Sequence, residues 1–200
     1  KYLTEEQKGT MSHIKSDKAQ LKRVICNKKT MKNKLMQMEC PLGSYVQYKT
    51  NVPDNPVPQE ALAVYLTINP RSLRRATGNS LSKFVDMLVR NDMAFFNPSN
   101  FAMSEIQRSV VNKKPYAIFD IDEKFEEADL KERIKKHLGD SDYRILETRG
   151  GYHIIVSLQN IDSKIKSSWY LGIQSEFGEE LDQAGDIMIP IPGTYQGMFI

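Results

Sequence analysis

The second half of the sequence alternates short apolar runs with longer segments of helical periodicity, and this alternation limits the folds open to the chain. Tyr116–Ile121 has the length and composition of a buried strand. Apolar residues then recur at helical spacing until Gly139 ends the pattern, namely Phe125, Leu130, Ile134 and Leu138. We therefore expect a strand followed by a helix at residues 116–138.

Two further strands and a second helix are expected downstream. The runs Tyr143–Glu147 and Tyr152–Leu158 flank the turn Thr148–Gly151, which predicts a hairpin. Ser167–Leu181 has apolar residues at helical spacing, and Ile187–Ile191 is a last apolar run. The predicted order is strand, helix, strand, strand, helix, strand. It is compatible with a ferredoxin-like sheet covered by helices on one face, so the sequence predicts an α+β fold.

The first 110 residues are expected to form two smaller parts. Lysines alternate with apolar residues through residue 40, which favours one or two helices, and a cluster of prolines at 41–60 marks a boundary. Beyond it we expect strands at Ser44–Thr50 and Ala61–Ile68, and a helix from about Leu81 to Val89. The predicted parts are a basic helical segment at 1–43, an α/β module at 44–110 and the larger sheet at 111–200, together one compact domain.

Positive charge gathers at the front of the chain. Residues 1–50 hold 11 basic and 4 acidic side chains, a net charge of +7, whereas residues 51–200 hold 17 and 21, a net charge of −4. Basic segments attract phosphate backbones through counterion release. The alternative is a solvated helical face, and the lysines alone do not decide between the two.

Several classes of protein are disfavoured. No apolar run approaches the roughly 18 residues of a membrane helix, and the first ten residues lack the apolar core of a signal peptide. Cys26 and Cys40 have neither zinc-ligand spacing nor the number for a disulfide framework. We therefore expect an intracellular, cytoplasmic protein without a membrane partner. Because the sequence begins with Lys1 and stops soon after a turn-like segment, it is compatible with a fragment of a longer protein.

Asp120 and Asp122 alternate at the end of the first predicted strand of the larger sheet, so both carboxylates project to the same face. Phe119 and Ile121 then point into the core. Two carboxylates about 7 Å apart along a strand can share hard cations, and Mg²⁺ prefers one or two carboxylates together with phosphate oxygens and water. The alternative is that the aspartates only cap the next helix, so Asp-x-Asp by itself stays ambiguous.

The turn at residues 148–153 (TRGGYH) is a second candidate element. Two adjacent glycines let the backbone approach a ligand and present N–H groups to an anion, while Arg149 and His153 add a cation and a donor. This combination predicts a cradle for a triphosphate. The alternative is an ordinary hairpin turn followed by a buried histidine of the core.

Three short motifs in this order resemble those of the catalytic core of archaeo-eukaryotic primases and primase-polymerases. The first is an apolar strand ending in Asp-x-Asp, here Ala117–Asp122 (AIFDID). The second is small-x-His, matched by Gly151-Tyr152-His153, and the third is an apolar residue followed by an acid, matched by Leu181-Asp182. Downstream, Asp186–Thr194 (DIMIPIPGT) is similar to the apolar strand and Pro-Gly turn of that family.

The resemblance implies that residues 111–200 form an RRM-like catalytic module of a DNA primase or primase-polymerase. It implies that Asp120, Asp122 and Asp182 are catalytic and bind two Mg²⁺ or Mn²⁺ ions, and that His153 and Gly151 contact the incoming nucleotide. Single-stranded DNA would be the template, NTPs or dNTPs the substrates, and a helicase or another replication subunit a candidate partner. A phage, a virus or another mobile element is a candidate source.

One position departs from the family. Many members have Arg just before the Pro-Gly turn, where this sequence has Pro190. Arg149 and Arg71 are therefore candidates for the cation that binds phosphate. Two further candidates follow the strand at 61–68, and the alternative of an ordinary surface helix applies to them slightly more than to Arg71: Arg74 and Arg75. Asp186 rivals Asp182 as the third acidic ligand, because both lie between the last helix and the last strand.

Two other functions stay open. A non-catalytic module that binds single-stranded nucleic acid could use such a sheet, but its carboxylates would repel phosphates and YAIFDI lacks the aromatic pattern of RNA-binding sheets. A metal-dependent nuclease could use the same carboxylates with His153, although no His-x-His motif supports it. The sequence does not distinguish NTPs from dNTPs or de novo priming from extension, and it leaves the oligomeric state open.

Overall fold

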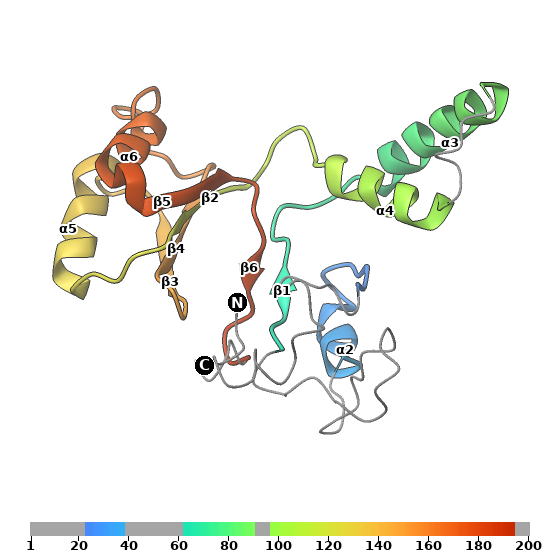
Figure 1. Cartoon of the computed structure of the whole chain (residues 1–200). Coiled ribbons are helices and arrows are strands. Elements are labelled where there is room, and N and C mark those ends of the chain that lie inside the picture. Colours follow the sequence, from blue (N-terminus) through green and yellow to red (C-terminus); the bar gives the residue numbers. More distant parts are fainter. Residues whose placement is uncertain (1–22, 39–61, 91–96, 195–200) are drawn as a thin grey trace. The chain divides into compact units, whose positions relative to one another are not determined.

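The four-stranded sheet expected in the second half of the chain is present in the computed structural model, which describes residues 23–38, 62–90 and 97–194 and is mixed α+β (Figure 1). In chain order the elements are α2 (Met31–Met36), β1 (Tyr65–Leu66), α3 (Leu73–Val89), α4 (Pro98–Arg108), β2 (Tyr116–Ile121), α5 (Glu127–Leu138), β3 (Tyr143–Glu147), β4 (Tyr152–Ser157), α6 (Trp169–Phe177), the 3₁₀ turn η3 (Gly178–Glu180), β5 (Leu181–Gly185) and β6 (Ile189–Pro190).

The chain divides into two compact units. One comprises residues 1–65 and 190–200, and the other comprises residues 66–189. The short strands β1 and β6 form a two-stranded sheet of their own. The sequence-based limits at residues 43 and 110 describe a different division and stay predictions.

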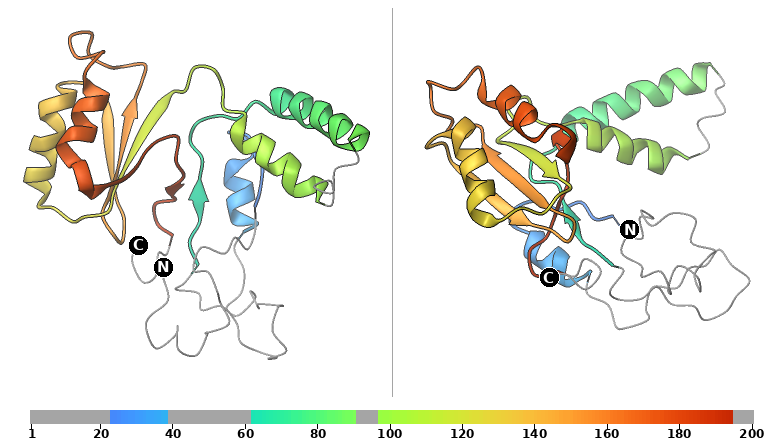
Figure 2. Two further views of the ribbon diagram at one scale, coloured as in Figure 1. Left: turned by 45° about the horizontal axis from the view of Figure 1, so that its top comes forward. Right: turned by 60° about the vertical axis from the view of Figure 1, so that its left-hand side comes forward.

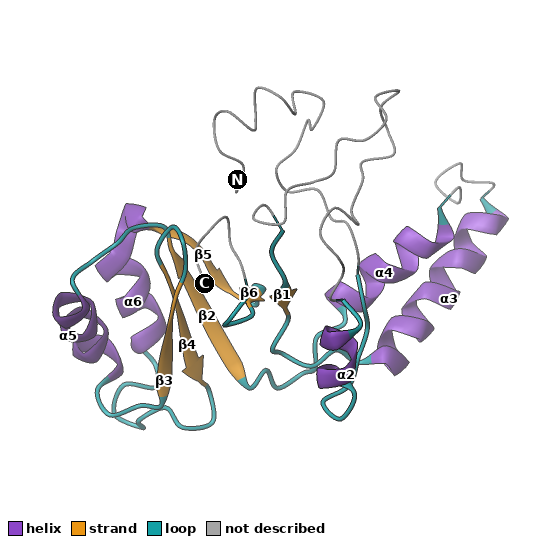
Figure 3. Ribbon diagram, turned by 90° about the horizontal axis from the view of Figure 1, so that it is seen from below, coloured by secondary structure: helices purple, strands orange, loops and turns teal. Residues whose placement is uncertain are grey.

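The larger sheet has the strand order β3-β4-β2-β5, and each neighbouring pair is antiparallel. Helices α5 and α6 both cover the same face of this sheet (Figures 2 and 3). Each helix connects two strands that are not neighbours, whereas β3 and β4 follow one another as a hairpin. Strand β2 is therefore central, and its two neighbours are β4 and β5.

Alternation along the strands decides which side chains enter the core. In β2, Phe119 and Ile121 are fully buried, and in β4 so are Ile154 and Val156. The helices complete this core with residues spaced to lie on one face, namely Leu130, Ile134 and Leu138 of α5 and Trp169, Ile173 and Phe177 of α6. Because successive strand residues face opposite sides, Asp120 is directed to the face without helices.

The local predictions for residues 116–158 are confirmed. Strand β2 has the bounds expected from its apolar run, α5 covers the predicted helical segment, and β3 and β4 form the predicted hairpin. Helix α5 ends at Gly139, whose φ of 54° is a backbone conformation that favours glycine. Local pattern was therefore sufficient for these elements.

The last helix and strand differ from the prediction. Helix α6 ends at Phe177 and not at Leu181, because Gly178 adopts a φ of 43° and a 3₁₀ turn follows. The fourth strand of the sheet is Leu181–Gly185, and the apolar run predicted as a strand, Ile187–Ile191, contains only the two-residue β6. The prediction was wrong because it placed Leu181 in the helix and left the other residues that pair with β2, from Gln183 to Gly185, in the connection to the last strand.

The elements before β2 also differ. The predicted strand Ala61–Ile68 is reduced to β1, whose partner β6 is equally short. Helix α3 begins eight residues earlier than expected, where the Ser72 side chain accepts a hydrogen bond from the N–H of Arg75. Helix α4 was not predicted, although Asn97-Pro98 is a typical helix start. The predicted strand Ser44–Thr50 lies outside the described residues.

Helices α3 and α4 pack against each other through the rings of Phe84 and Phe101, whose centres lie 5.1 Å apart. Glu105 is buried between them and accepts hydrogen bonds from Lys83 and Arg108, and the bond from Lys83 lowers the pKa of its carboxyl group. None of the helices in the described ranges has the length and apolar character that a bilayer crossing needs.

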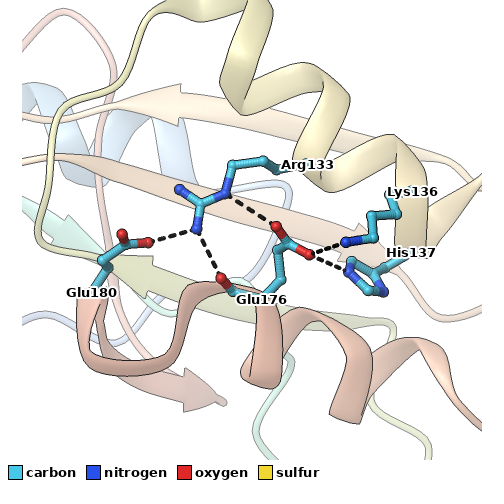
Figure 4. A network of polar contacts seen from close by, with 5 residues as sticks. All are labelled: Arg133, Lys136, His137, Glu176 and Glu180. Carbon is cyan, nitrogen blue, oxygen red and sulfur yellow. Dashed lines mark hydrogen bonds and ion pairs between the residues drawn. The ribbon is translucent and has the colours of Figure 1, made fainter.

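A network of charged side chains links α5 to the end of α6 (Figure 4). Arg133 donates to the backbone O of Glu176 and to Oε2 of Glu180, both at 2.8 Å, and lies over the rings of two phenylalanines. Oε2 of Glu176 lies 2.8 Å from Nε2 of His137 and from Nζ of Lys136. These contacts, first of all that with His137, lower the pKa of Glu176 from 4.5 to about 2.

The lowered pKa of Glu176 predicts a stability change in acid. A carboxylate whose pKa falls on folding stabilises the protein above pH 4.5, and this contribution is lost as the pH drops towards 2. We expect Glu176→Gln to lower the free energy of unfolding by about 2 kcal/mol at pH 7. The loss of stability below pH 4.5 should also become shallower. Urea unfolding between pH 2 and pH 7 measures both, with Glu132→Gln, an exposed position on α5, as the control. Equal pH profiles for the wild type and the Glu176 variant would contradict the prediction.

Candidate active site

Asp120 and His153 face each other across neighbouring strands. They are directly opposed in the register of β2 and β4, and Nε2 of His153 lies 3.0 Å from Oδ1 of Asp120. The imidazole is buried, with 6% of its side chain exposed, whereas the Asp120 side chain retains 21%. A buried ring beside a partly exposed carboxylate can hold that carboxylate in one orientation while leaving it accessible to a ligand.

The second ring nitrogen of His153 has no hydrogen-bond partner among the described residues. Nδ1 is buried, and an unsatisfied buried polar atom typically costs about 1–3 kcal/mol. Such an atom in a native structure calls for a physical explanation. Because Nε2 is the nitrogen that faces Asp120, the contacts of the described residues leave the unsatisfied Nδ1 unexplained.

The Gly-Gly turn lies directly against the end of β2. A Cβ atom on Gly151 would be 1.8 Å from the backbone O of Ile121, so only glycine permits this approach. A Cβ atom on Gly150 would meet Oδ1 of Asp122 at an ordinary 3.6 Å. The turn is closed by hydrogen bonds from the N–H of Thr148 to the O of Gly151 and from the N–H of Gly151 to Oγ1 of Thr148. The predicted turn therefore lies next to Asp122. Arg149, between Thr148 and Gly150 in this turn, is exposed.

Asp182 lies at the same end of β2, on β5, the strand that pairs with the other edge of β2. In the pairing of β2 with β5, Asp120 is opposite Gln183 and Ile121 is opposite Leu181, which leaves Asp182 as an extra residue at an irregularity. Such bulges redirect side chains and occur next to active sites. The Asp182 side chain is exposed and accepts a hydrogen bond only from its neighbour Gln183 among the contacts of the described residues.

Asp186, the rival of Asp182, lies at the opposite end of β2 in a separate contact. Its Oδ1 accepts a hydrogen bond from Nδ2 of Asn69 at 2.8 Å, and its Oδ2 is paired with Arg71. Asn69 is fully buried and also exchanges hydrogen bonds with the backbone N–H and C=O of Tyr116, the first residue of β2. Tyr116 and Asp120 are about 13 Å apart along the strand. The structure therefore does not place Arg71 beside Asp120.

Sequence reasoning did not identify several acidic side chains near Asp122. A hollow at the end of α6 is lined by Asp122, Glu123, Glu176, Phe177, Gly178, Glu179 and Glu180. Two of these carboxylates are paired with Arg133. Two signals were available in the sequence, namely Glu123 next to Asp122 and the pair Glu179-Glu180 directly after the glycine that ends α6. These charges would repel nucleic-acid phosphates on this side of β2.

The residues fit a divalent ion only in part. Among the described residues, no three His, Cys, Asp or Glu side chains lie close enough together to hold a metal ion by themselves. Mg²⁺ normally keeps several waters and takes one or two carboxylates together with substrate phosphates. The carboxylates at the end of β2 suit that mode, and the predicted two-ion site on Asp120, Asp122 and Asp182 stays a prediction.

Comparisons with protein-family models, with curated proteins and with solved structures found no match for this chain. The residues and their geometry therefore carry what can be inferred about function.

Proposed function

We propose that the chain is a template-dependent nucleotidyltransferase of the primase-polymerase type. The observation that supports this best is the pairing of Asp120 with His153 across β2 and β4, at the strand end that Asp122 and Asp182 also occupy. These are the positions at which the three sequence motifs resemble the archaeo-eukaryotic primases. Motifs separated by some thirty residues each along the sequence meet at one end of one strand.

The strand order also supports the proposal. A sheet in the order β3-β4-β2-β5, built from the succession β-α-β-β-α-β with every neighbour antiparallel, has the connectivity of the ferredoxin-like or RRM-like module. This is the fold that the resemblance implies for residues 111–200. A fold of this type hosts many functions, so the site and not the fold must support the activity.

The chain's own groups suggest a division of roles. Asp120 presents its carboxylate at the face without helices, where His153 holds it in place, and Asp122 adds a second carboxylate directly after the end of β2. Backbone N–H groups of the turn and the exposed Arg149 would bind phosphate oxygens of the incoming nucleotide. Divalent ions bound with the nucleotide would lower the pKa of the attacking hydroxyl and stabilise charge on the α-phosphate.

The two alternative functions make different demands. A non-catalytic binder of single-stranded nucleic acid would gain nothing from carboxylates at the centre of its sheet, because they repel phosphates. A nuclease could use the same groups, but it would cleave a strand and would not release pyrophosphate. Products thus distinguish all three functions.

The direct test is synthesis on a single-stranded DNA template, with and without a primer, using labelled NTPs or dNTPs and Mg²⁺ or Mn²⁺. Metal-dependent extension with release of pyrophosphate supports the proposal and reveals the sugar preference. Cleavage of the template would favour the nuclease, and metal-independent DNA binding without any product would favour the binding module.

The different surroundings of Asp182 and Asp186 predict opposite phenotypes. Asp182→Asn should lower nucleotide incorporation at least about a hundredfold and leave the melting temperature unchanged, because that side chain is exposed. Asp186→Asn should instead destabilise the fold by about 2 kcal/mol, because it leaves Arg71 without its charged partner. Extension assays and thermal unfolding of both variants check this. The reverse pattern would make Asp186 the third acidic residue of the site.

A further inference from the structure

Lys124 connects the end of β2 with the turn between β3 and β4. Its Nζ donates to Oε1 of Glu147 and to the backbone O of Thr148, both at 2.6 Å. The same ammonium lies 5.1 Å from the centre of the Tyr152 ring. Lys124 therefore contacts the last residue of β3, the first residue of the turn and the first residue of β4.

The turn that Lys124 contacts is the one that closely approaches β2. Gly151 lies against the backbone of Ile121, and Gly150 lies beside the carboxylate of Asp122. Lys124 follows Asp122 by two residues, so one short segment supplies both the carboxylate and the cation that holds the turn. The relative position of Asp122 and the turn thus depends on this segment.

The contact with Thr148 also orients the next peptide group. In a trans peptide the C=O and the following N–H point in opposite directions. With the oxygen of Thr148 fixed on Lys124, the N–H of Arg149 points away from Lys124. A charge-assisted hydrogen bond of this kind is stronger than a neutral one, so it fixes the first N–H group after Thr148 in one direction.

We propose that Lys124 is a positioning residue that fixes the Thr148–Gly151 turn against Asp122 and thereby sets the geometry of nucleotide binding. The second half of this proposal rests on the proposed function, whereas the first half does not. In the ion pair with Glu147, the Lys124 side chain is 40% exposed and the Glu147 side chain is 56% exposed. Exposed ion pairs of this kind add little to overall stability. The effect of Lys124 is therefore local.

The test uses Lys124→Met, which keeps the length of the side chain and removes its charge, and Lys124→Arg, which restores a donor. The control is Lys131→Met, because Lys131 is a comparably exposed lysine on α5 that also pairs with one glutamate, Glu127. Amide hydrogen exchange at residues 149–151 reports the turn without any substrate. Nucleotide titrations on a primed template report KM and kcat.

In Lys124→Met we expect exchange at Gly151, whose N–H donates to Oγ1 of Thr148 within the turn, to become about tenfold faster. KM for the nucleotide should rise about tenfold with kcat within about threefold, and Lys124→Arg should restore most of both. Unchanged exchange would overturn the positioning role, and faster exchange with unchanged KM would overturn its part in nucleotide binding. If the wild type makes no product, the proposed function fails, and exchange alone decides the role of Lys124.

Discussion

Replacing Asp120 and Asp122 together by asparagine should abolish nucleotide incorporation without unfolding the protein. Two carboxylates at the end of β2 are the groups best suited to divalent ions and to charge at the reacting phosphate, so activity should fall at least about a thousandfold. Asparagine keeps the shape of both side chains, and its amide oxygen can still face Nε2 of His153. The melting temperature should therefore stay within about 3 °C of the wild type.

Incorporation of labelled nucleotides on a single-stranded template, in Mg²⁺ and in Mn²⁺, measures this effect. Asp140→Asn is the matched control, because Asp140 is an exposed aspartate in the turn after α5. It should retain full activity. A double variant of Asp120 and Asp122 that keeps more than about a tenth of wild-type synthesis would refute the assignment of this site, since the remaining acid could not replace both carboxylates.

The elements that sequence pattern predicted are those whose signals are local. Strand β2 is a continuous apolar run, and α5 has a clear helical period ended by Gly139, so each could be assigned without its neighbours. Strand β5 has no such signal. Its sequence LDQAG has a single large apolar residue, and it forms a strand because it pairs with β2 on the side not used by β4.

The candidate site divides in the same way. The motifs indicated Asp120 and His153 separately. That the two residues lie opposite each other depends on the register between β2 and β4, and the sequence spacing of 33 residues does not determine that register. The contact of Asp186 with Asn69 joins residues 117 apart in sequence and could not be predicted either. The sequence alone therefore could not decide whether Asp182 or Asp186 is the third acidic residue of the site. The sequence offered no reason to select Lys124, because a single lysine after a strand is ordinarily a surface residue.

The two adjacent glycines of the turn should respond very differently to a single added methyl group. In Gly151→Ala the new Cβ would lie 1.8 Å from the backbone O of Ile121 and 2.9 Å from the N of Glu123. Neither is a flexible side chain, so the turn would have to move away from β2. We expect the free energy of unfolding to fall by about 3 kcal/mol, with nucleotide incorporation reduced as well.

Gly150→Ala is the matched control for that variant. Its Cβ would meet only Oδ1 of Asp122, at 3.6 Å, so the free energy of unfolding should change by less than about 1 kcal/mol. Urea unfolding of both variants, fitted with a common slope, gives the difference directly. Equal stability of the two variants would show that the turn does not lie against β2, and the link between the Gly-Gly turn and Asp122 would then be lost.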